Sequence, residues 1–171
     1  TVVNSASDSE ITYNYLVSKE LLGDESVRDT LNDSLVENNI PVANATNYNL
    51  TNDTFYLFFD ENGLRNNITS ESLTFIGEFS EVGPWIGIDR PIKLLSDNAT
   101  LNDIAFIINS DNVTIDGFNF ISENRADLIE IFNADNVSVI NNNFDVTGVE
   151  DDDNAVIRLI QSDNVVIDNN K

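Results

Sequence analysis

Three segments in the second half of the chain share one pattern, and this pattern decides the fold. They are Ser110-Asp-Asn-Val-Thr-Ile-Asp-Gly-Phe-Asn-Phe120, Ala134-Asp-Asn-Val-Ser-Val-Ile-Asn-Asn-Asn-Phe144 and Ser162-Asp-Asn-Val-Val-Ile-Asp-Asn-Asn-Lys171. Their Asp-Asn pairs begin at positions 111, 135 and 163, so the intervals are 24 and 28 residues. The longer interval contains Gly148-Val-Glu-Asp-Asp-Asp-Asn154, which indicates a loop insertion of about four residues. Repeats that gain length in one loop are typical of a solenoid.

Apolar and polar residues alternate within each repeat, as in strands that bury one face. A helical solenoid would need a 3.6-residue period and better helix formers than Asn, Asp, Val and Ile, and the leucine pattern of leucine-rich repeats is absent. We therefore predict an all-β right-handed parallel β-helix, or β-solenoid, with strands of successive turns about 4.8 Å apart. Two inward-facing aliphatic ladders are expected, formed by Val113, Val137 and Val165 and by Ile115, Val139 and Ile167, with Thr114, Ser138 and Val166 facing outward.

The same alignment predicts which polar and aromatic side chains stack between turns. Asn112, Asn136 and Asn164 should share one corner, where Asn tolerates left-handed backbone geometry and amides can hydrogen-bond along the stack. Phe120 should stack on Phe144. Glu130 and Arg158 each lie five residues before an Asp-Asn pair, so they should face outward as neighbours and form an exposed ion pair worth about 0.2–1 kcal/mol.

Upstream of the repeats the pattern changes, and we expect three parts. Residues 1–50 contain one amphipathic helix at 24–38, which begins at an Asp24 cap, followed by a polar connector at 44–54. Residues 51–91 form an N-terminal cap in which Trp85 packs, with strands at 55–59 and 73–76 around an Asn62-Gly63 turn. Residues 92–171 form the rungs, with 97–106 as a strand on a neighbouring face of the first turn. We expect a natural chain that continues beyond Lys171 and, because Met is absent, a removed leader or a trimmed end.

Composition excludes several classes of function. The chain has 171 residues, with 30 acidic against 8 basic residues and a net charge of -22. Neutralising nucleic-acid phosphates needs a basic surface, so nucleic acid is not an expected partner, and anionic membrane surfaces are disfavoured. No apolar run is long enough to insert in a membrane. The absence of Cys and His removes thiol nucleophiles, Ser-His-Asp triads and thiolate zinc sites.

Asparagine is abundant, and eight positions fit the Asn-x-Ser/Thr acceptor pattern for glycosylation. Such triplets also arise by chance in an Asn-rich chain, but with the missing leader they favour an extracellular location. The eight candidates are Asn32, Asn44, Asn49, Asn52, Asn67, Asn98, Asn112 and Asn136.

The chain resembles the adhesin-like surface proteins of methanogenic archaea, whose β-helix repeats carry Ser-Asp-Asn-Val-Thr-Ile motifs like the one at 110–115. The expected cap is similar as well, through Phe-Phe-Asp-Glu-Asn-Gly at 58–63, Ile-Gly-Glu-Phe-Ser at 76–80, Pro-Ile-Lys-Leu at 91–94 and Asp-Asn-Ala-Thr-Leu at 97–101. The likeness covers about residues 52–171. It implies a large secreted protein attached to the cell surface, with adhesion to other cells or to glycans as its role, and it assigns no site residues. We therefore expect a non-catalytic cell-surface adhesin or structural spacer.

A carbohydrate-active enzyme, either a polysaccharide hydrolase or a lyase cut short before its full active site, is the alternative. A hydrolase needs two carboxylates about 5–9.5 Å apart, and the candidate pairs are Asp116 with Glu130 and Asp151 with Asp153. With 30 acidic residues such pairs arise throughout the chain, so a solvated role is favoured. Lyases add basic residues near the sugar acid, and the repeats offer only Arg125, Arg158 and Lys171.

Two further groups of residues could bind ligands. Glu150, Asp151, Asp152 and Asp153 cluster the carboxylates that Ca²⁺ prefers, which makes Ca²⁺ the one candidate cofactor, although their spacing matches no EF-hand and a solvated loop is favoured. The aromatic residues Tyr13, Tyr15, Tyr48 and Trp85 could stack on sugars, but packing or disorder is favoured for them. The oligomeric state cannot be read from the sequence.

Overall fold

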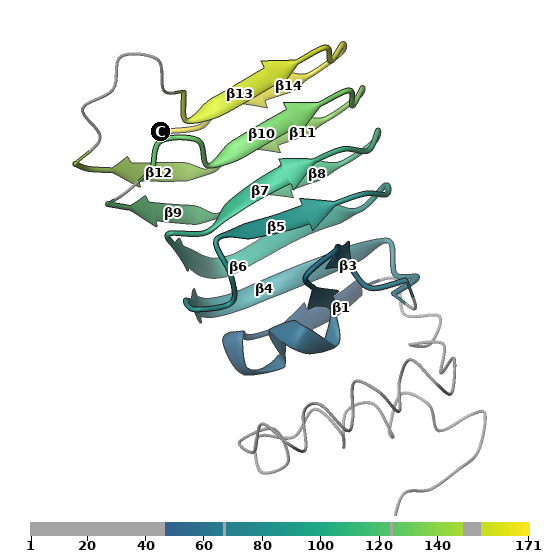
Figure 1. The fold of residues 1–171 in the computed structure, drawn as a ribbon, viewed down its shortest axis with the longest axis vertical. Coiled ribbons are helices and arrows are strands. Elements are labelled where there is room, and N and C mark those ends of the chain that lie inside the picture. Colours follow the sequence, from purple (N-terminus) through teal and green to yellow (C-terminus); the bar gives the residue numbers. More distant parts are fainter. Residues whose placement is uncertain (1–46, 67, 124, 149–154) are drawn as a thin grey trace, which may run out of the picture.

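The computed structural model describes residues 47–66, 68–123, 125–148 and 155–171. Two parallel sheets run along the molecule, and each turn after the first adds strands to both (Figure 1). The larger sheet contains β1 (Asn47–Leu50), β4 (Ser72–Phe79), β6 (Lys93–Asn102), β8 (Thr114–Asp116), β9 (Asn119–Ser122), β11 (Ser138–Ile140), β12 (Asn143–Val146) and β14 (Val166–Asp168). The smaller sheet contains β5 (Trp85–Ile88), β7 (Ala105–Ile108), β10 (Ile129–Phe132) and β13 (Ile157–Ile160). The predicted all-β parallel solenoid is confirmed.

Strand neighbours in the larger sheet come from successive turns of the chain. The order is β1-β4-β6-β8-β11-β14, while β9 pairs with both β6 and β12. The smaller sheet has the order β5-β7-β10-β13. Every pair in these two sheets is parallel. Because the chain must cross from one sheet to the other and back between parallel neighbours, the core lies between the sheets.

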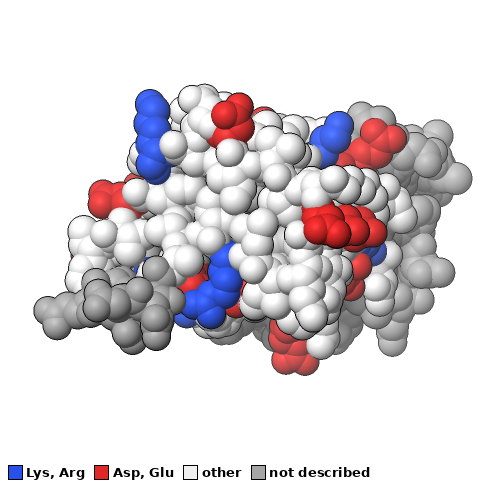
Figure 2. Space-filling view, turned by 90° about the horizontal axis from the view of Figure 1, so that it is seen from above, with Lys and Arg blue, Asp and Glu red and all other residues white. Residues whose placement is uncertain are grey.

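The register predicted from the repeats is confirmed. Val139 pairs with Ile115 on one side and with Ile167 on the other. Val113 and Val137 are fully buried and Val165 is partly buried against the core, whereas Val166 is 50% exposed. Ile167 is 47% exposed although it continues the ladder of Ile115 and Val139, because it lies on the last turn. Seen from above that turn, the charged residues lie around the periphery and the centre is uncharged (Figure 2).

Phenylalanine side chains fill the space between the two sheets. Phe120 and Phe144 stack as predicted, with ring centroids 4.9 Å apart and an interplanar angle of 15°. Phe106 and Phe118 contact each other edge-to-face at 5.6 Å, and Phe118 contacts Phe75 on β4, two strands earlier in the larger sheet, at 5.2 Å. Such edge-to-face pairs add to the stabilisation that burial provides. The aromatic core therefore continues across several turns rather than being confined to one stack.

Glu130 and Arg158 are direct neighbours on β10 and β13, as predicted, but the ion pair expected between them is wrong. A guanidinium nitrogen of Arg158 lies 3.0 Å from a carboxylate oxygen of Asp127 instead. Arginine carries its charge at the end of a long side chain, so strand pairing fixes its backbone position without fixing which carboxylate it meets. Asp127 is also the more sheltered partner, with a side chain that is 24% exposed.

The parallel ladder starts upstream of residue 92, where we expected the first rung. β1 pairs with β4, and β4 pairs with β6, in parallel. Residues 47–50, which we assigned to a polar connector, therefore form a strand, with Tyr48 and Leu50 buried. The repeat motif is absent from these turns, so its alignment could not reveal them. The expected helix at 24–38 lies outside the described residues.

Residues 55–59, predicted as a strand, are instead mostly part of the 3-10 helix η1 (Asn52–Leu57), so this prediction is wrong. The backbone N–H of Thr51 donates to the Thr54 hydroxyl at 2.9 Å and that of Thr54 to the Thr51 carbonyl at 3.1 Å, which tightens the chain into a turn. Phe55, Leu57, Phe58 and Phe59 are all buried. The 3-10 helix lies at the N-terminal end of the described solenoid, beside β1 (Figure 1). The strand predicted at 73–76 lies within β4.

The turn predicted at Asn62-Gly63 is present. It joins β2 (Phe59–Asp60) to β3 (Gly63–Leu64) in an antiparallel hairpin. Gly63 has a φ of 110°, and a Cβ there would lie 2.6 Å from the carbonyl oxygen of Gly87. Only glycine lets the hairpin approach β5 this closely.

Residues 97–106 do not form one strand on a neighbouring face, as we expected. Residues 97–102 end β6, where Leu101 pairs with Phe120 of β9 in the larger sheet. The chain then turns at Asp103, which has a φ of 53°. Residues 105–108 form β7 in the smaller sheet. The segment therefore contains the corner between the two sheets.

Replacing Ile115 by Ala should lower the free energy of unfolding by about 2–5 kcal/mol, because it leaves a cavity in a fully buried ladder. Ile167→Ala is the matched control: it removes the same atoms from the same ladder, but at a residue that is 47% exposed, and should cost much less. Denaturant unfolding of the two variants measures the difference. Equal losses would contradict the assigned register.

Candidate functional site

Aspartate, rather than asparagine, forms the hydrogen-bond ladder at the first corner. The backbone N–H of Asp135 donates to a carboxylate oxygen of Asp111 at 2.7 Å, and the N–H of Asp163 donates to Asp135 at 2.7 Å. Charge-assisted hydrogen bonds of this kind are stronger than neutral ones. Among the described residues, no hydrogen bond joins the side-chain amides of Asn112, Asn136 and Asn164, so the predicted amide ladder is wrong there.

Those three asparagines act through their backbone. Their φ angles are 59°, 57° and 55°, which is the left-handed region predicted for this corner. Asparagine adopts this region more readily than other residues with a Cβ. All three are exposed, so the left-handed turn directs the amides to solvent while the preceding aspartates stack.

An amide ladder does exist at the next corner, at residues that the sequence reasoning missed. Asn142 is 1% exposed, and its side-chain oxygen accepts the backbone N–H of Phe118 at 2.9 Å. Its side-chain nitrogen donates to the Ile115 carbonyl at 3.1 Å and to the Asn170 side chain at 3.0 Å. The signal was present, since Asn142 and Asn170 occupy equivalent places in two repeats. The ladder satisfies backbone groups that would otherwise be buried without partners.

The carboxylate pair proposed for hydrolysis is not assembled on one face. Asp116 belongs to β8 in the larger sheet and Glu130 to β10 in the smaller one. A carboxylate oxygen of Asp116 accepts a hydrogen bond from the side-chain nitrogen of Asn141 at 2.8 Å. The side-chain oxygen of Asn141 in turn accepts one from the side-chain nitrogen of Asn169 at 2.7 Å. Asp116 therefore contributes to a third ladder between turns. The second pair, Asp151 and Asp153, lies outside the described residues, between β12 and β13.

The Ca²⁺ candidates Glu150, Asp151, Asp152 and Asp153 also lie outside the described residues. Within the part of the chain that the structure describes, no group of three or more carboxylates is arranged to hold a metal ion. In the same residues, no helix is long and apolar enough to cross a membrane.

Three of the glycosylation candidates occupy outward corners. Asn98, Asn112 and Asn136 are exposed and have positive φ angles. Asn49 is exposed on β1, whereas Asn52 is partly buried and its side-chain oxygen accepts the backbone N–H of Ser80 at 3.0 Å. The remaining three, Asn32, Asn44 and Asn67, lie outside the described residues.

Trp85 does not pack in a cap, as we expected, but stands at the surface with 43% of its area exposed. The Arg125 guanidinium lies 4.1 Å from the centroid of the indole ring and donates a hydrogen bond to the Pro84 carbonyl at 2.6 Å. This cation–π contact holds the ring from one side. Tyr48 is buried, which removes it as a sugar platform, and Tyr13 and Tyr15 lie outside the described residues.

A cleft of about 530 Å³ lies beside Trp85, and we call it the Trp85 cleft. The buried side chains of Phe55, Phe59 and Val82 line it. Its polar lining includes Tyr56, Asp60, Glu61 and Glu81.

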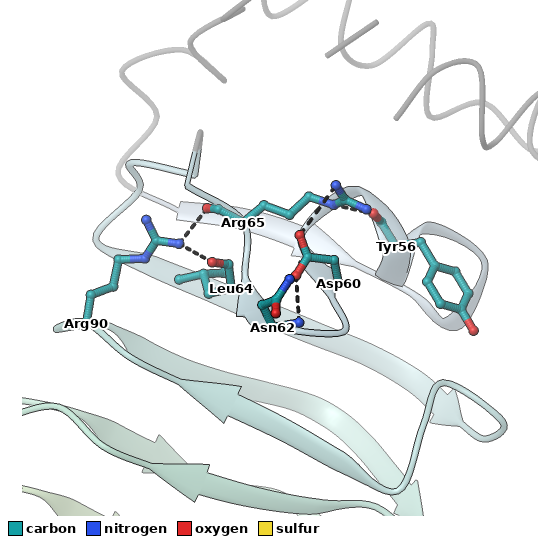
Figure 3. Close-up of polar contacts among 6 residues, drawn as sticks. All are labelled: Tyr56, Asp60, Asn62, Leu64, Arg65 and Arg90. Atoms are coloured by element: carbon teal, nitrogen blue, oxygen red, sulfur yellow. Dashed lines mark hydrogen bonds and ion pairs between the residues drawn. The ribbon is translucent and has the colours of Figure 1, made fainter. Parts of the chain in front are cut away.

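Hydrogen bonds hold the polar side of this cleft in place (Figure 3). The Asp60 carboxylate accepts the backbone N–H of Asn62 at 2.9 Å and lies 3.6 Å from the Arg65 guanidinium. Arg65 also donates to the Tyr56 carbonyl at 2.8 Å, and Arg90 donates to the carbonyls of Leu64 and Arg65. Across the cleft, the Tyr56 hydroxyl donates to the Glu81 carbonyl at 3.2 Å. No sequence motif indicates the cleft, because its lining residues come from two separate segments, 55–61 and 81–85.

Comparison with known proteins adds no family assignment. No protein-family model matches the sequence, and no curated protein or solved structure is significantly similar to the chain.

Asn142→Leu should lower the free energy of unfolding by about 2–4 kcal/mol, because it leaves the buried Phe118 N–H without its acceptor and removes the hydrogen bond to the Ile115 carbonyl. Asn143→Leu makes the same chemical change at the next residue, which is exposed, and should shift stability by less than about 0.5 kcal/mol. Denaturant titration compares the two. A mild effect of Asn142→Leu would argue against a structural ladder.

Moderate NaCl should raise the melting temperature by a few degrees, because salt screens the mutual repulsion within a net charge of -22. CaCl₂ at matched ionic strength separates screening from binding. A further rise with Ca²⁺ that disappears when residues 150–153 carry amides would assign a site to that loop, while equal effects of the two salts leave screening alone. Thermal unfolding followed by circular dichroism measures both.

Proposed function

We propose that this chain is a non-catalytic part of a cell-surface adhesin or structural spacer that attaches its cell to other cells or to glycans. The proposal includes the relationship to adhesin-like surface proteins of methanogenic archaea, and with it an extracellular location. The observation that carries it is the parallel register that runs through β1, β4, β6, β8, β11 and β14, with a shift only between β4 and β6 among these described strands.

Such a register suits a spacer for a mechanical reason. Each turn rests on the previous one through backbone hydrogen bonds, side-chain ladders and an apolar stack, so the body resists bending. Each added turn extends the body by about 4.8 Å without changing its cross-section. A rigid body of this kind can hold a binding surface at a fixed distance from a cell.

The surface chemistry agrees with an exposed extracellular role. Asn98, Asn112 and Asn136 present acceptor patterns at outward corners, where these residues are exposed. The strong negative charge keeps neighbouring copies apart and disfavours nucleic acid as a partner. Glycans or proteins of other cells that are neutral or basic are the partners that this surface favours.

The alternative, a polysaccharide hydrolase or lyase, gains no support from the described residues. The one candidate carboxylate pair that is described, Asp116 and Glu130, is divided between the two sheets, and Asp116 is engaged in a ladder. If the chain released reducing ends or unsaturated sugars from neutral or acidic polysaccharides, that activity would support the hydrolase or lyase alternative.

Beads coated with the chain should bind methanogen cells or immobilised glycans, and multivalency should make the beads adhere about 10²-fold more tightly than the free chain. Beads coated with an albumin acetylated to a similar negative charge serve as the control for electrostatic adhesion. Flow cytometry counts the cell-bound beads. Retention no greater than that of the control, on both cells and glycans, would leave only the spacer role.

A further inference from the structure

We infer that the Trp85 cleft is a binding site for neutral oligosaccharides. This inference rests on the proposed attachment to glycans and specifies where it occurs. An exposed indole, free carboxylates and two adjoining depressions meet at one place on the solenoid, and each of the three features points to the same class of ligand.

The indole of Trp85 provides an apolar platform that is already fixed in position. Arg125 comes from the turn between β9 and β10, stacks on the ring and is tied to the Pro84 carbonyl at 2.6 Å. The ring therefore loses little freedom when a ligand packs against the surface that remains exposed. Sugar rings carry C–H groups on their faces, and these groups pack on the electron-rich face of an aromatic ring while the hydroxyl groups stay polar at the rim.

The carboxylates at the rim are available as hydrogen-bond acceptors for sugar hydroxyls. Glu61 and Glu81 are both exposed, and neither has a side-chain hydrogen bond or ion pair within the described residues. Asp60 is oriented by Asn62 and Arg65. Hydrogen bonds to an ionised acceptor are stronger than neutral ones, so a few of them fix a ligand that the aromatic surface only attracts.

A second depression adjoins the Trp85 cleft on the side of the next turn. This depression of about 310 Å³ shares Glu81, Gly83 and Pro84 with the Trp85 cleft and reaches Asn102, Asp103 and Ile104 on the next turn. The Asp103 carboxylate is held there by the Ser122 hydroxyl at 2.9 Å. A surface that crosses two turns fits several linked sugar units better than a single one.

The charge of the site selects among carbohydrates. Asp60, Glu61 and Glu81 lie at the first depression and Asp103 at the second, so an anionic polysaccharide would meet repulsion along the whole groove. Neutral sugars avoid this cost while their hydroxyl groups supply the donors that carboxylates require. A small organic cation could also pack between an aromatic ring and carboxylates, and the experiment has to distinguish it.

Trp85 is the one tryptophan in the chain, so intrinsic tryptophan fluorescence reports directly on this cleft. The full chain is titrated with cellohexaose, maltohexaose and mannohexaose, then with polygalacturonate and tetramethylammonium chloride. At least one neutral hexaose should shift the emission to shorter wavelength in a saturable way, and polygalacturonate should not. Saturation by tetramethylammonium, or no response to any neutral hexaose, overturns the inference.

Isothermal titration of variants with the responding hexaose tests the residues. Trp85→Ala should weaken binding at least about tenfold through the lost ring contact, whereas Phe132→Ala, which removes another exposed aromatic residue on β10, should leave affinity unchanged. Glu81→Gln should weaken binding about threefold to tenfold, and Glu78→Gln on β4, outside the cleft, should not. Circular dichroism confirms that each variant is folded. Equal affinity of Trp85→Ala and the unsubstituted chain overturns the inference.

The bead assay separates this inference from the proposed function. If Trp85→Ala beads lose cell binding together with hexaose binding, the cleft mediates adhesion. If beads coated with the Trp85→Ala variant still bind cells as well as beads coated with the unsubstituted chain, attachment does not take place at the Trp85 cleft. That result would overturn the inference but not the proposed adhesive function. Failure of the unsubstituted beads on both cells and glycans would remove the adhesive function itself.

Discussion

The structure depends on corners that occur at equivalent positions in successive turns of the solenoid. Parallel strands pair only if each turn returns the chain directly above the previous one, and left-handed residues at the corners make this return possible. Asn112, Asn136 and Asn164 form one such set, and Gly117, Asn141 and Asn169 form the next along the chain. A residue at these corners must tolerate a positive φ, and this requirement selects asparagine and glycine. The abundance of asparagine is therefore largely a consequence of the fold.

Fixed corners make the interior predictable from the sequence. Between two left-handed corners only three residues form a strand, and alternation leaves one orientation for each of them, as at Thr114–Asp116. The fold class, the buried valine ladder and the Phe120–Phe144 stack followed directly from the alignment. Insertions are tolerated only where the chain leaves the ladder. The four extra residues of the last interval accordingly fall between β12 and β13.

The predictions that failed concern atoms far from the repeated backbone. Alignment placed Arg158 beside Glu130 correctly, yet its flexible side chain reached Asp127. It also identified the Asp-Asn corner but assigned the ladder to Asn112 rather than Asp111, because the sequence does not show which of two adjacent polar side chains points along the axis. The first turns lacked the motif altogether, so the parallel pairing of β1 and β4 had no sequence signal. Trp85 is partly exposed and contacts Arg125, which lies 40 positions away in the sequence, so no local pattern could predict its surroundings.

The contrast between regular and irregular turns also explains where a selective site can form. In the repeated rungs, corner and interior positions serve the stack, and even carboxylates such as Asp111 and Asp116 are engaged in ladders. The first turns follow no repeat and can present unrelated side chains together. There η1, the β2–β3 hairpin and the loop before β5 bring Tyr56, Glu81 and Trp85 to one cleft. The regular rungs then supply the rigid support, including Arg125, against which that cleft is held.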